Sequence, residues 1–236
     1  MINVNKIICA IDTSDISFAE QLVSSIEYKI IFKIGLEFYY NFGLQGINRL
    51  RKIKPEMKLF LDLKLHDIPN TVKKSIIPLL KSINPFMLTI HVSGGASMLE
   101  EVAQTVHKIS NENNFKKPML LGVTILTSLS DEDRDELGWN ANLSEQAIKL
   151  AILAKKTGLD GVIASAFEIK GIKKACGNSF KVITPGIRMP EHKSDDQARI
   201  MTPIEAINNG ADFIVIGRPI VQASDPNMAI KNICNF

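Results

Sequence analysis

Residues 60–72, FLDLKLHDIPNTV, place a lysine between two aspartates, at Asp62, Lys64 and Asp67. Side chains two apart on a strand share a face, so Asp62 and Lys64 point the same way while the neighbouring leucines point the other way. An ammonium between carboxylates stays protonated even where burial would discharge it, because nearby opposite charge counters desolvation. The spacing therefore predicts a lysine held in place as a general acid.

The charges of this segment gather where its predicted strand ends. Residues 58–61 form a mostly apolar lead-in, and Pro69 turns the chain out of the sheet. Parallel sheets place their ligands at the carboxyl ends of the strands. A solvated charged face on a half-exposed strand is the alternative interpretation, and this placement makes it the weaker one.

The order of apolar and amphipathic segments predicts the fold class. Short apolar runs recur about every 20 to 35 residues with helix-like segments between them, which is typical of repeated βα units. We expect strands at residues 7–12, 30–34, 58–64, 86–92, 119–125, 161–165, 181–185 and 213–217. We expect helices at 14–27, 45–54, 71–82, 96–111, 144–157, 168–175, 202–209 and 225–232, several of them with Ser or Thr caps.

Eight βα units in 236 residues predict an α/β protein, a single-domain (β/α)8 TIM barrel over residues 1–236. Polar residues and turn residues collect at the same end of the predicted strands, where such barrels build their sites. These strand-end residues are Asp12, Lys33, Asp62, Lys64, His91, Thr124, Thr127, Pro185, Gly186, Gly217 and Arg218. A doubly wound open sheet would gather residues in the same way, so it remains the alternative architecture.

Two longer connections, 128–143 and 187–198, follow the fifth and seventh predicted strands. Long loops in compact domains are often lids or binding loops. The second connection is polar and carries both charge signs, so we expect the lid there.

Composition excludes several classes of protein. The chain is 45% hydrophobic and 22% charged, enough for a large core, and its net charge of +3 is spread without a basic stripe, so no nucleic-acid binding is expected. Cys9, Cys176 and Cys234 are far apart and have no metal-ligand spacing, which suits free thiols in a reducing cytoplasm. No apolar run is long enough for a membrane span or a signal peptide, so we expect a cytoplasmic protein.

A phosphate site is predicted at residues 215–220, VIGRPI, where a strand leads to Gly217 and then Arg218 at a helix start. Backbone N–H groups at such a turn, with the forked donors of arginine, bind phosphate after the last strands of many barrels. A glycine turn with a solvated arginine is the alternative.

Seven segments together resemble the orotidine 5′-phosphate decarboxylase family, over residues 8 to about 222. They are AID at 10–12, FKIG at 32–35, DLKLHDIPNT at 62–71, LTS at 126–128, TPGIR at 184–188, DDQAR at 195–199 and VIGRPI at 215–220. The resemblance implies a homodimeric barrel that converts the small molecule orotidine 5′-phosphate to UMP in de novo pyrimidine synthesis. It also implies that no metal and no organic cofactor takes part.

The resemblance also assigns catalytic roles to individual residues. It implies that Lys64 protonates the ring carbon that loses carbon dioxide, within a charge network of Lys33, Asp62, Lys64 and Asp67. Asp67 would come from the partner subunit, so that the two active sites of the dimer are shared.

Further residues are expected to bind the substrate. Asp12 and Lys33 would hold ribose hydroxyls with Thr71 of the partner nearby, and Asp62 would lie near the substrate carboxylate. The other implied contacts are Thr127 and Ser128 at the pyrimidine edge, Gln197, Gly217 and Arg218 at the phosphate, and Arg188 in the closing lid.

Two other functions fit parts of the pattern. A metal-dependent sugar-phosphate decarboxylase or epimerase could hold Mg²⁺ through the carboxylates of D-x-K-x-x-D, but Lys33 would occupy the place and charge of the ion. A non-catalytic phosphate-binding barrel is the second alternative, and the intact Lys64 argues against it. We expect His66 to be structural, and we assign no chemistry to His91, His107 or His192.

Overall fold

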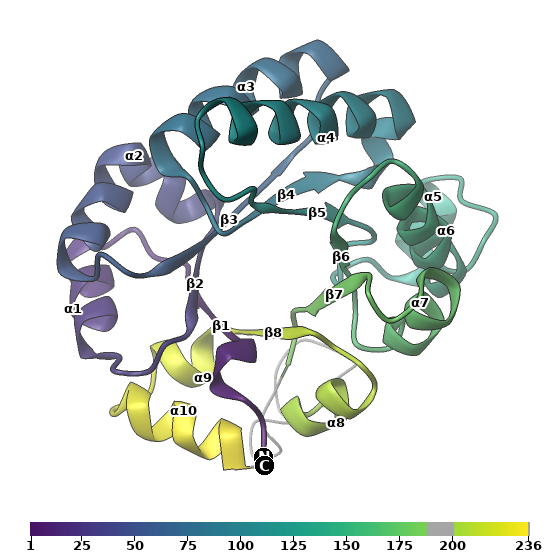
Figure 1. Ribbon diagram of the computed structural model, residues 1–236. Coiled ribbons are helices and arrows are strands. Elements are labelled where there is room, and N and C mark those ends of the chain that lie inside the picture. The colour runs from purple at the N-terminus through teal and green to yellow at the C-terminus, as the bar shows by residue number, and fades with distance from the viewer. Residues whose placement is uncertain (188–200, 236) are drawn as a thin grey trace.

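Parallel strands close into a barrel that a ring of helices surrounds (Figure 1). The computed structural model describes residues 1–187 and 201–235, and in these residues eight strands pair in chain order, with β1 also pairing with β8. The strands are β1 (Ile7–Ile11), β2 (Ile31–Ile34), β3 (Lys58–Leu65), β4 (Met87–His91), β5 (Met119–Val123), β6 (Gly161–Ile163), β7 (Lys181–Thr184) and β8 (Phe213–Ile216). The predicted (β/α)8 barrel is confirmed, and a doubly wound open sheet is excluded.

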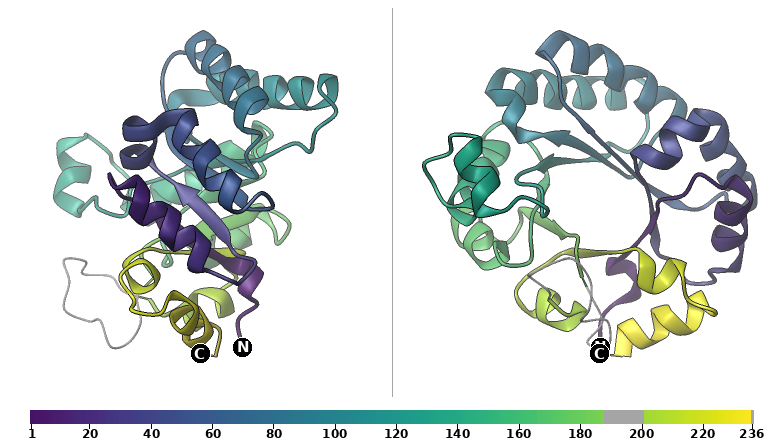
Figure 2. Two further views of the ribbon diagram at one scale, coloured as in Figure 1. Left: turned by 90° about the vertical axis from the view of Figure 1, so that its left-hand side faces the viewer. Right: turned by 180° about the vertical axis from the view of Figure 1, so that it is seen from behind.

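Helices alternate with the strands and cover the outside of the barrel, as the views from the side and from behind show (Figure 2). They are α1 (Ile16–Ser25), α2 (Leu36–Ile53), α3 (Pro69–Ile83), α4 (Gly95–Glu112), α5 (Asp131–Glu136), α6 (Leu143–Lys156), α7 (Ile169–Cys176), α8 (Pro203–Asn208), α9 (Arg218–Val221) and α10 (Pro226–Asn235). Short 3-10 turns, η1 (Val4–Lys6) and η2 (Val92–Gly94), precede β1 and follow β4.

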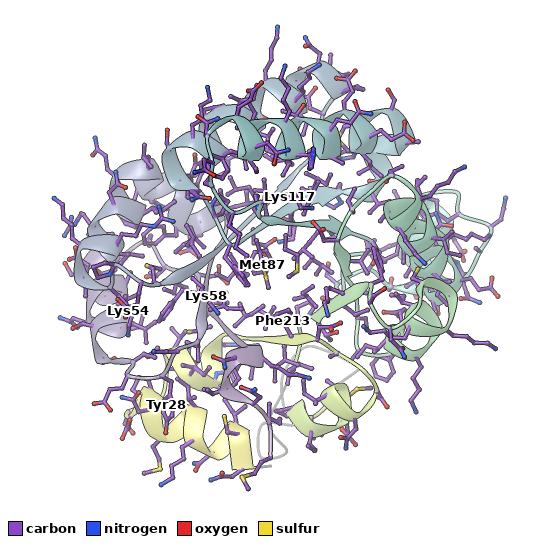
Figure 3. The ribbon with its side chains drawn as sticks, viewed as in Figure 1. Tyr28, Lys54, Lys58, Met87, Lys117 and Phe213 are labelled. Atoms are coloured by element: carbon purple, nitrogen blue, oxygen red, sulfur yellow. The ribbon has the colours of Figure 1, made fainter. Side chains whose placement is uncertain are left out.

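The strands are buried on both faces, which explains their continuous apolar sequences. Inward-facing side chains such as Phe60, Met87 and Leu121 fill the barrel, and Met87 and Phe213 lie near its axis (Figure 3). Their sequence neighbours, such as Leu61, point outward and form a second core against the helices. The period of two along each strand thus divides the hydrophobic residues between the two cores.

Helix α2 begins at Leu36, nine residues before the helix start predicted at residue 45, so that predicted start is wrong. Its two helical parts meet at Gly43, where φ is 53° and ψ is −146°. This left-handed residue interrupts the 3.6-residue repeat, because the chain changes direction there. The apolar pattern therefore marked only the second part of the helix.

Helix α5 lies inside the connection that was expected to be a loop. Ser130 and Asp133 form a reciprocal capping box at its start, with Ser130 N–H donating to Asp133 Oδ2 over 2.7 Å. The helix buries none of its residues, so it has no apolar periodicity by which to recognise it. Its cap was the only sequence signal.

Asp212 fastens the amino ends of β7 and β8 together. Its carboxylate accepts hydrogen bonds from Lys173 Nζ at 2.6 Å, Lys181 Nζ at 2.9 Å and the Val182 backbone N–H at 2.9 Å. Burial alone would raise the pKa of Asp212, but these donors lower it below its usual value. The charged carboxylate therefore stabilises this end of the barrel.

The same arrangement occurs between β5 and β6. Asp160 accepts from Lys117 Nζ at 2.7 Å and from the Leu120 backbone N–H at 2.8 Å. Both aspartates follow a glycine with positive φ that ends a helix, Gly158 at 88° and Gly210 at 106°. Residues 157–163, TGLDGVI, and 209–215, NGADFIV, are therefore one structural unit used twice.

Cys9, Cys176 and Cys234 are free thiols, as the sequence predicted. Burial is the main cause that raises the pKa of Cys9 to about 12, so this thiol stays protonated inside the barrel wall. In the part of the chain that the structure describes, no helix has the length and apolar character needed to cross a bilayer.

The Asp212 cluster predicts a pH-dependent stability difference. At pH 7, Asp212→Asn should lower the free energy of unfolding by about 1–3 kcal/mol, because three donors lose a charged acceptor. A carboxyl with a lowered folded-state pKa contributes stability above its unfolded pKa of about 3.9 and loses it as the pH falls through the folded value. The difference should therefore shrink below about pH 4, as measured by urea denaturation across this range.

Glu112→Gln is the matched control, because its ion pair with Lys108 spans 3.8 Å between side chains that are 53% and 72% exposed. We expect a change under about 0.5 kcal/mol there. A deficit in Asp212→Asn that stayed constant from pH 7 to pH 3 would show that the carboxylate charge is not the cause.

Candidate active site

A cavity of about 360 Å³ opens at the carboxyl ends of the strands. Among the residues of the expected site, seven line it: Asp12, Lys33, Asp62, Lys64, Thr127, Gly217 and Arg218. Its floor consists of inward-facing apolar residues of the barrel, among them Phe60, Val123 and Val215. The barrel thus brings together side chains from five different strand ends.

Four charged residues form a chain of alternating sign along this cavity. Asp12 Oδ1 lies 3.2 Å from Lys33 Nζ, and Lys33 Nζ lies 3.5 Å from Asp62 Oδ2. The same Asp62 oxygen lies 2.9 Å from Lys64 Nζ. Neighbouring parallel strands β1, β2 and β3 supply these residues, and their register sets the order.

Asp62 is the buried centre of this chain, with 6% of its surface exposed. Burial alone would raise its pKa, but the charges of Lys33 and Lys64, with hydrogen bonds from Lys64 and Thr89, lower the pKa below its usual value. The carboxylate is therefore anionic at neutral pH. An anion in this position holds two ammonium groups beside the cavity.

The backbone of Lys64 has a left-handed conformation, with φ of 49°. Such a conformation costs a residue with a side chain about 1–3 kcal/mol and often marks a functional site. It coincides with a shift in the register between β3 and β4, which falls between Leu61 and Leu65. This bulge lies beside the cavity that Asp62 and Lys64 line, as bulges next to active sites commonly do.

Asp67 and Thr71 do not line the cavity of their own chain. Asp67 is exposed, and its carboxylate accepts a hydrogen bond from the Ile68 N–H at 2.6 Å. None of the ion pairs found among residues 1–187 and 201–235 includes Asp67. Thr71 is also exposed, in the first turn of α3.

The remaining expected residues lie around the rim or outside the described part. Thr127 and Ser128 are exposed after β5, and Ser128 lines an adjoining cavity of about 610 Å³. Gly217 and Arg218 begin α9, which confirms the helix start predicted there. Arg188, Gln197 and nearly all of the expected lid at 187–198 lie outside the described residues.

Two residues of the site were missed in the sequence. Thr89 lies within β4, fully buried, and bonds to both Asp62 and Lys64. Its signal was a polar residue inside an apolar strand, two positions before His91 and so on the same face. Gly35 is the second, because a Cβ there would lie 2.7 Å from Asp12 Oδ1. Its FKIG segment was noted, but only Lys33 within it was given a role.

The imidazole rings of His66 and His91 pack together beside Lys64, with centroids 5.2 Å apart. Burial first, and then the nearby charges of His66 and Lys64, lower the pKa of His91. The sequence did not predict this contact. Among the described residues, no three His, Cys, Asp or Glu side chains gather as metal ligands would.

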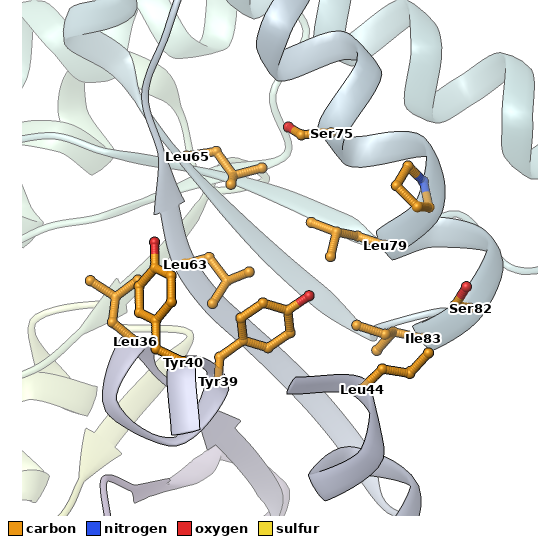
Figure 4. A pocket seen from close by; sticks show the side chains of 11 residues that line it. Leu36, Tyr39, Tyr40, Leu44, Leu63, Leu65, Ser75, Leu79, Ser82 and Ile83 are labelled. Atoms are coloured by element: carbon orange, nitrogen blue, oxygen red, sulfur yellow. The ribbon is translucent and has the colours of Figure 1, made fainter. Parts of the chain in front are cut away.

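An apolar groove lies outside the barrel between α2 and α3, and we call it the α2–α3 groove (Figure 4). It has a volume of about 360 Å³ and is lined by Leu36, Tyr39, Tyr40, Leu44, Leu63, Leu65, Ser75, Pro78, Leu79, Ser82 and Ile83. Figure 4 shows Tyr39 and Tyr40 opposite Leu79, with Leu63 and Leu65 of β3 between the helices. Tyr40 is 82% exposed, and Ile68 near the site is 65% exposed.

Comparisons with known proteins agree on one family. The model of the orotidine 5′-phosphate decarboxylase / HUMPS family matches residues 5–233. An orotidine 5′-phosphate decarboxylase of Wolbachia pipientis subsp. Culex pipiens (strain wPip) is 47% identical over 223 residues, covering 94% of each chain. One of Legionella pneumophila (strain Corby) is 42% identical over 227 residues, covering 96% of each.

Solved structures give the same result. The crystal structure of orotidine 5′-phosphate decarboxylase from Lactobacillus acidophilus superposes with a TM-score of 0.84 at 35% identity, covering 97% of each chain. The sequence and the fold of this chain match those of the family members over nearly its whole length. This match confirms the resemblance found in the motifs. The chain therefore belongs to the orotidine 5′-phosphate decarboxylase / HUMPS family.

Proposed function

We propose that this protein decarboxylates orotidine 5′-phosphate to UMP in pyrimidine nucleotide synthesis. The observation that carries the proposal is the Lys64 ammonium, held 2.9 Å from a buried carboxylate at the edge of a cavity in the barrel mouth. The relatives named for this activity, which match the chain almost from end to end, support it.

The chemistry of the reaction requires such a group. When the bond to the carboxylate breaks, carbon dioxide leaves and its electron pair remains on a ring carbon, in the plane of the ring. No adjacent carbonyl can delocalise that pair, so a preorganised positive charge is the available means of stabilisation. Lys64 supplies the charge and then donates its proton to the same carbon, and solvent restores the proton afterwards.

Asp62 contributes in a second way, by repelling the substrate carboxylate. Two like charges 4 Å apart interact by about 4 kcal/mol at an effective dielectric of 20, and this repulsion disappears as carbon dioxide departs. Enzymes lower their barriers by about 8–23 kcal/mol in total, so this contribution is a minor one. Most of the effect must come from the field of the ammonium groups and from binding energy of the distant phosphate.

The rest of the cavity binds the substrate in this proposal. Asp12 and Lys33, paired at 3.2 Å, hold ribose hydroxyls at the ends of β1 and β2. Thr127 and Ser128 contact the pyrimidine edge from the loop after β5. Gly217 and Arg218 take the phosphate together with Gln197, and Arg188 belongs to a lid over residues 187–198.

A second copy of the chain completes the site. Asp67 lies outside the ion-pair chain of its own subunit, which supports its insertion beside Lys64 of the partner, with Thr71 following. The exposed Ile68 next to Asp67, and the α2–α3 groove with its exposed tyrosine, provide apolar surface for the contact. The dimer would therefore have two shared active sites.

The reaction proceeds in this proposal without a metal or an organic cofactor. Lys33 Nζ lies 3.5 Å from Asp62 and 3.2 Å from Asp12, so an ammonium occupies the region between the two carboxylates. A divalent cation bound there would have to displace that charge. This position of Lys33 argues against the metal-dependent sugar-phosphate enzymes considered above.

Loss of Lys64 gives the direct test of the function. The wild-type protein should convert orotidine 5′-phosphate to UMP, followed by the fall in ultraviolet absorbance of the substrate. Lys64→Ala should lower kcat by at least about 1,000-fold while the phosphate still binds, because the ammonium acts mainly in the transition state. Lys108→Ala removes an exposed lysine of α4 and should match the wild type.

A wild-type protein that binds UMP but never turns over the substrate would instead favour the non-catalytic phosphate-binding barrel. A Lys64→Ala variant within about tenfold of wild-type kcat would remove Lys64 from the central role.

Removal of metals tests cofactor independence. Activity should survive exhaustive treatment with EDTA, because Lys33 leaves no site for a hard cation between Asp12 and Asp62. Initial rates before and after chelation, with metal content checked by mass spectrometry, give the measurement. Loss of activity that added Mg²⁺ restores would favour the metal-dependent alternative.

Mixed dimers test the shared site. Lys64→Ala and Asp67→Ala homodimers should both be inactive, since every site lacks one member. When equal amounts of the two variants exchange subunits at random, half of the dimers become mixed. Each mixed dimer has one intact site out of two. Activity should therefore recover to about a quarter of the wild-type value under two-fold symmetry.

If Asp67 acted within its own chain, each mixed site would keep one defect and no activity would return. To exchange subunits, the two variants are denatured together and refolded. Native mass spectrometry of the refolded mixture then confirms that mixed dimers formed. Mixed dimers without activity would then contradict the shared-site arrangement.

A further inference from the structure

Thr89 lies opposite the irregular part of β3. Leu61 and Leu65 of β3 pair with the two residues of β4 that flank Thr89, so residues 62–64 face a single residue of the neighbouring strand. Thr89 is fully buried and points into the barrel, as Met87 does two positions earlier. Its side chain therefore fills the gap in the ladder that the bulge creates.

The hydroxyl of Thr89 makes two hydrogen bonds with fixed directions. The Lys64 backbone N–H donates to Thr89 Oγ1 over 2.9 Å, so the oxygen is the acceptor there. The hydroxyl has one proton, and it donates that proton to Asp62 Oδ1 over 3.0 Å. One side chain thus connects the backbone of Lys64 with the carboxylate of Asp62.

Both connected groups need such support. The two ammonium groups contact Asp62 through Oδ2, while Thr89 holds the other oxygen, Oδ1, and so fixes the rotation of the carboxylate. Lys64 has a left-handed backbone, which persists only where surrounding contacts determine it. The direction of the Lys64 side chain depends on that backbone.

We propose that Thr89 is a positioning residue of the decarboxylation site, which aligns the Lys64 ammonium through its backbone and the Asp62 carboxylate through its free oxygen. The inference rests on the proposed function. Thr89 need not touch the substrate, because it acts on the two groups that do. A misplacement of about 1 Å can cost a catalytic group 100-fold in rate.

Replacement of the hydroxyl tests this role. Thr89→Val keeps the shape of the side chain and removes both hydrogen bonds, and it should lower kcat about 100-fold with KM changed less than about threefold. Thr89→Ser keeps the hydroxyl and should restore kcat to within about fivefold of the wild type. If Thr89→Val does not fold, Thr89→Ala takes its place, because alanine also lacks the hydroxyl. The comparison is then between Thr89→Ala and Thr89→Ser.

Thr184→Val is the matched control. Thr184 is also a buried threonine of a barrel strand, but its hydroxyl has no hydrogen-bond partner within the described structure. It is the last residue of β7 and follows Ile183, which faces the barrel interior, so it points toward the helices. This variant should keep the wild-type kcat and KM.

Amide exchange provides a measurement that needs no turnover. The Lys64 N–H should exchange slowly in the wild type and in Thr89→Ser, and faster in Thr89→Val, because the acceptor is lost. Hydrogen exchange followed by mass spectrometry of the peptide around residue 64 reports this difference. Thermal denaturation of each variant shows that the comparison is made between folded proteins.

The outcomes separate this inference from the proposed function. An inactive wild-type protein would defeat the proposed function itself. An active wild type with kcat equal in Thr89→Val and Thr184→Val, or equal in Thr89→Ser and Thr89→Ala, would overturn the role of Thr89 alone. A fall in kcat/KM of Thr89→Val that comes from a raised KM, with kcat unchanged, would also overturn it. That pattern indicates lost substrate binding and not misaligned catalytic groups.

Discussion

The carboxylate of Asp62 is buried between two ammonium groups, and the mouth of the barrel is organised around this contact. A buried anion is expensive unless cations and hydrogen bonds compensate it, and here Lys33, Lys64 and Thr89 do so. Removal of either lysine would leave the buried Asp62 carboxylate with less compensating charge. The arrangement therefore holds its members in place before any substrate arrives, as the proposed stabilisation of a carbanion requires.

The barrel makes this contact possible through the order of its strands. Asp12, Lys33 and Asp62 come from β1, β2 and β3, which pair side by side in parallel, so their carboxyl ends place the alternating charges in a row. The amino end of the barrel uses charge for another purpose. There Asp212 connects the Val182 backbone with Lys173 and Lys181 across β7 and β8. One end of the barrel thus contributes stability, and the other carries the proposed active site, as in other barrels.

The bulge in β3 shows how local strain and function are connected. A regular strand would have kept Asp62 and Lys64 in the ladder with β4, whereas the shifted register gives Lys64 a left-handed backbone. The Thr89 hydroxyl of the neighbouring strand accepts a hydrogen bond from the Lys64 N–H and so supports that backbone. Strain of this kind persists because the packed barrel around it determines the conformation.

The sequence alone determined the eight strands, the order of the helices and the strand-end residues, because alternation and apolar runs are local properties that survive in any correct fold. It also placed Asp62 and Lys64 on one face. It failed at Gly43, where a kink interrupts the helical repeat, and at α5, which buries no residue. Only the tertiary structure revealed Thr89 and Gly35 beside the charged residues and the contact between His66 and His91. These contacts join residues that are far apart in the sequence and meet only when the strands pair. The periodicity within one segment therefore cannot predict them.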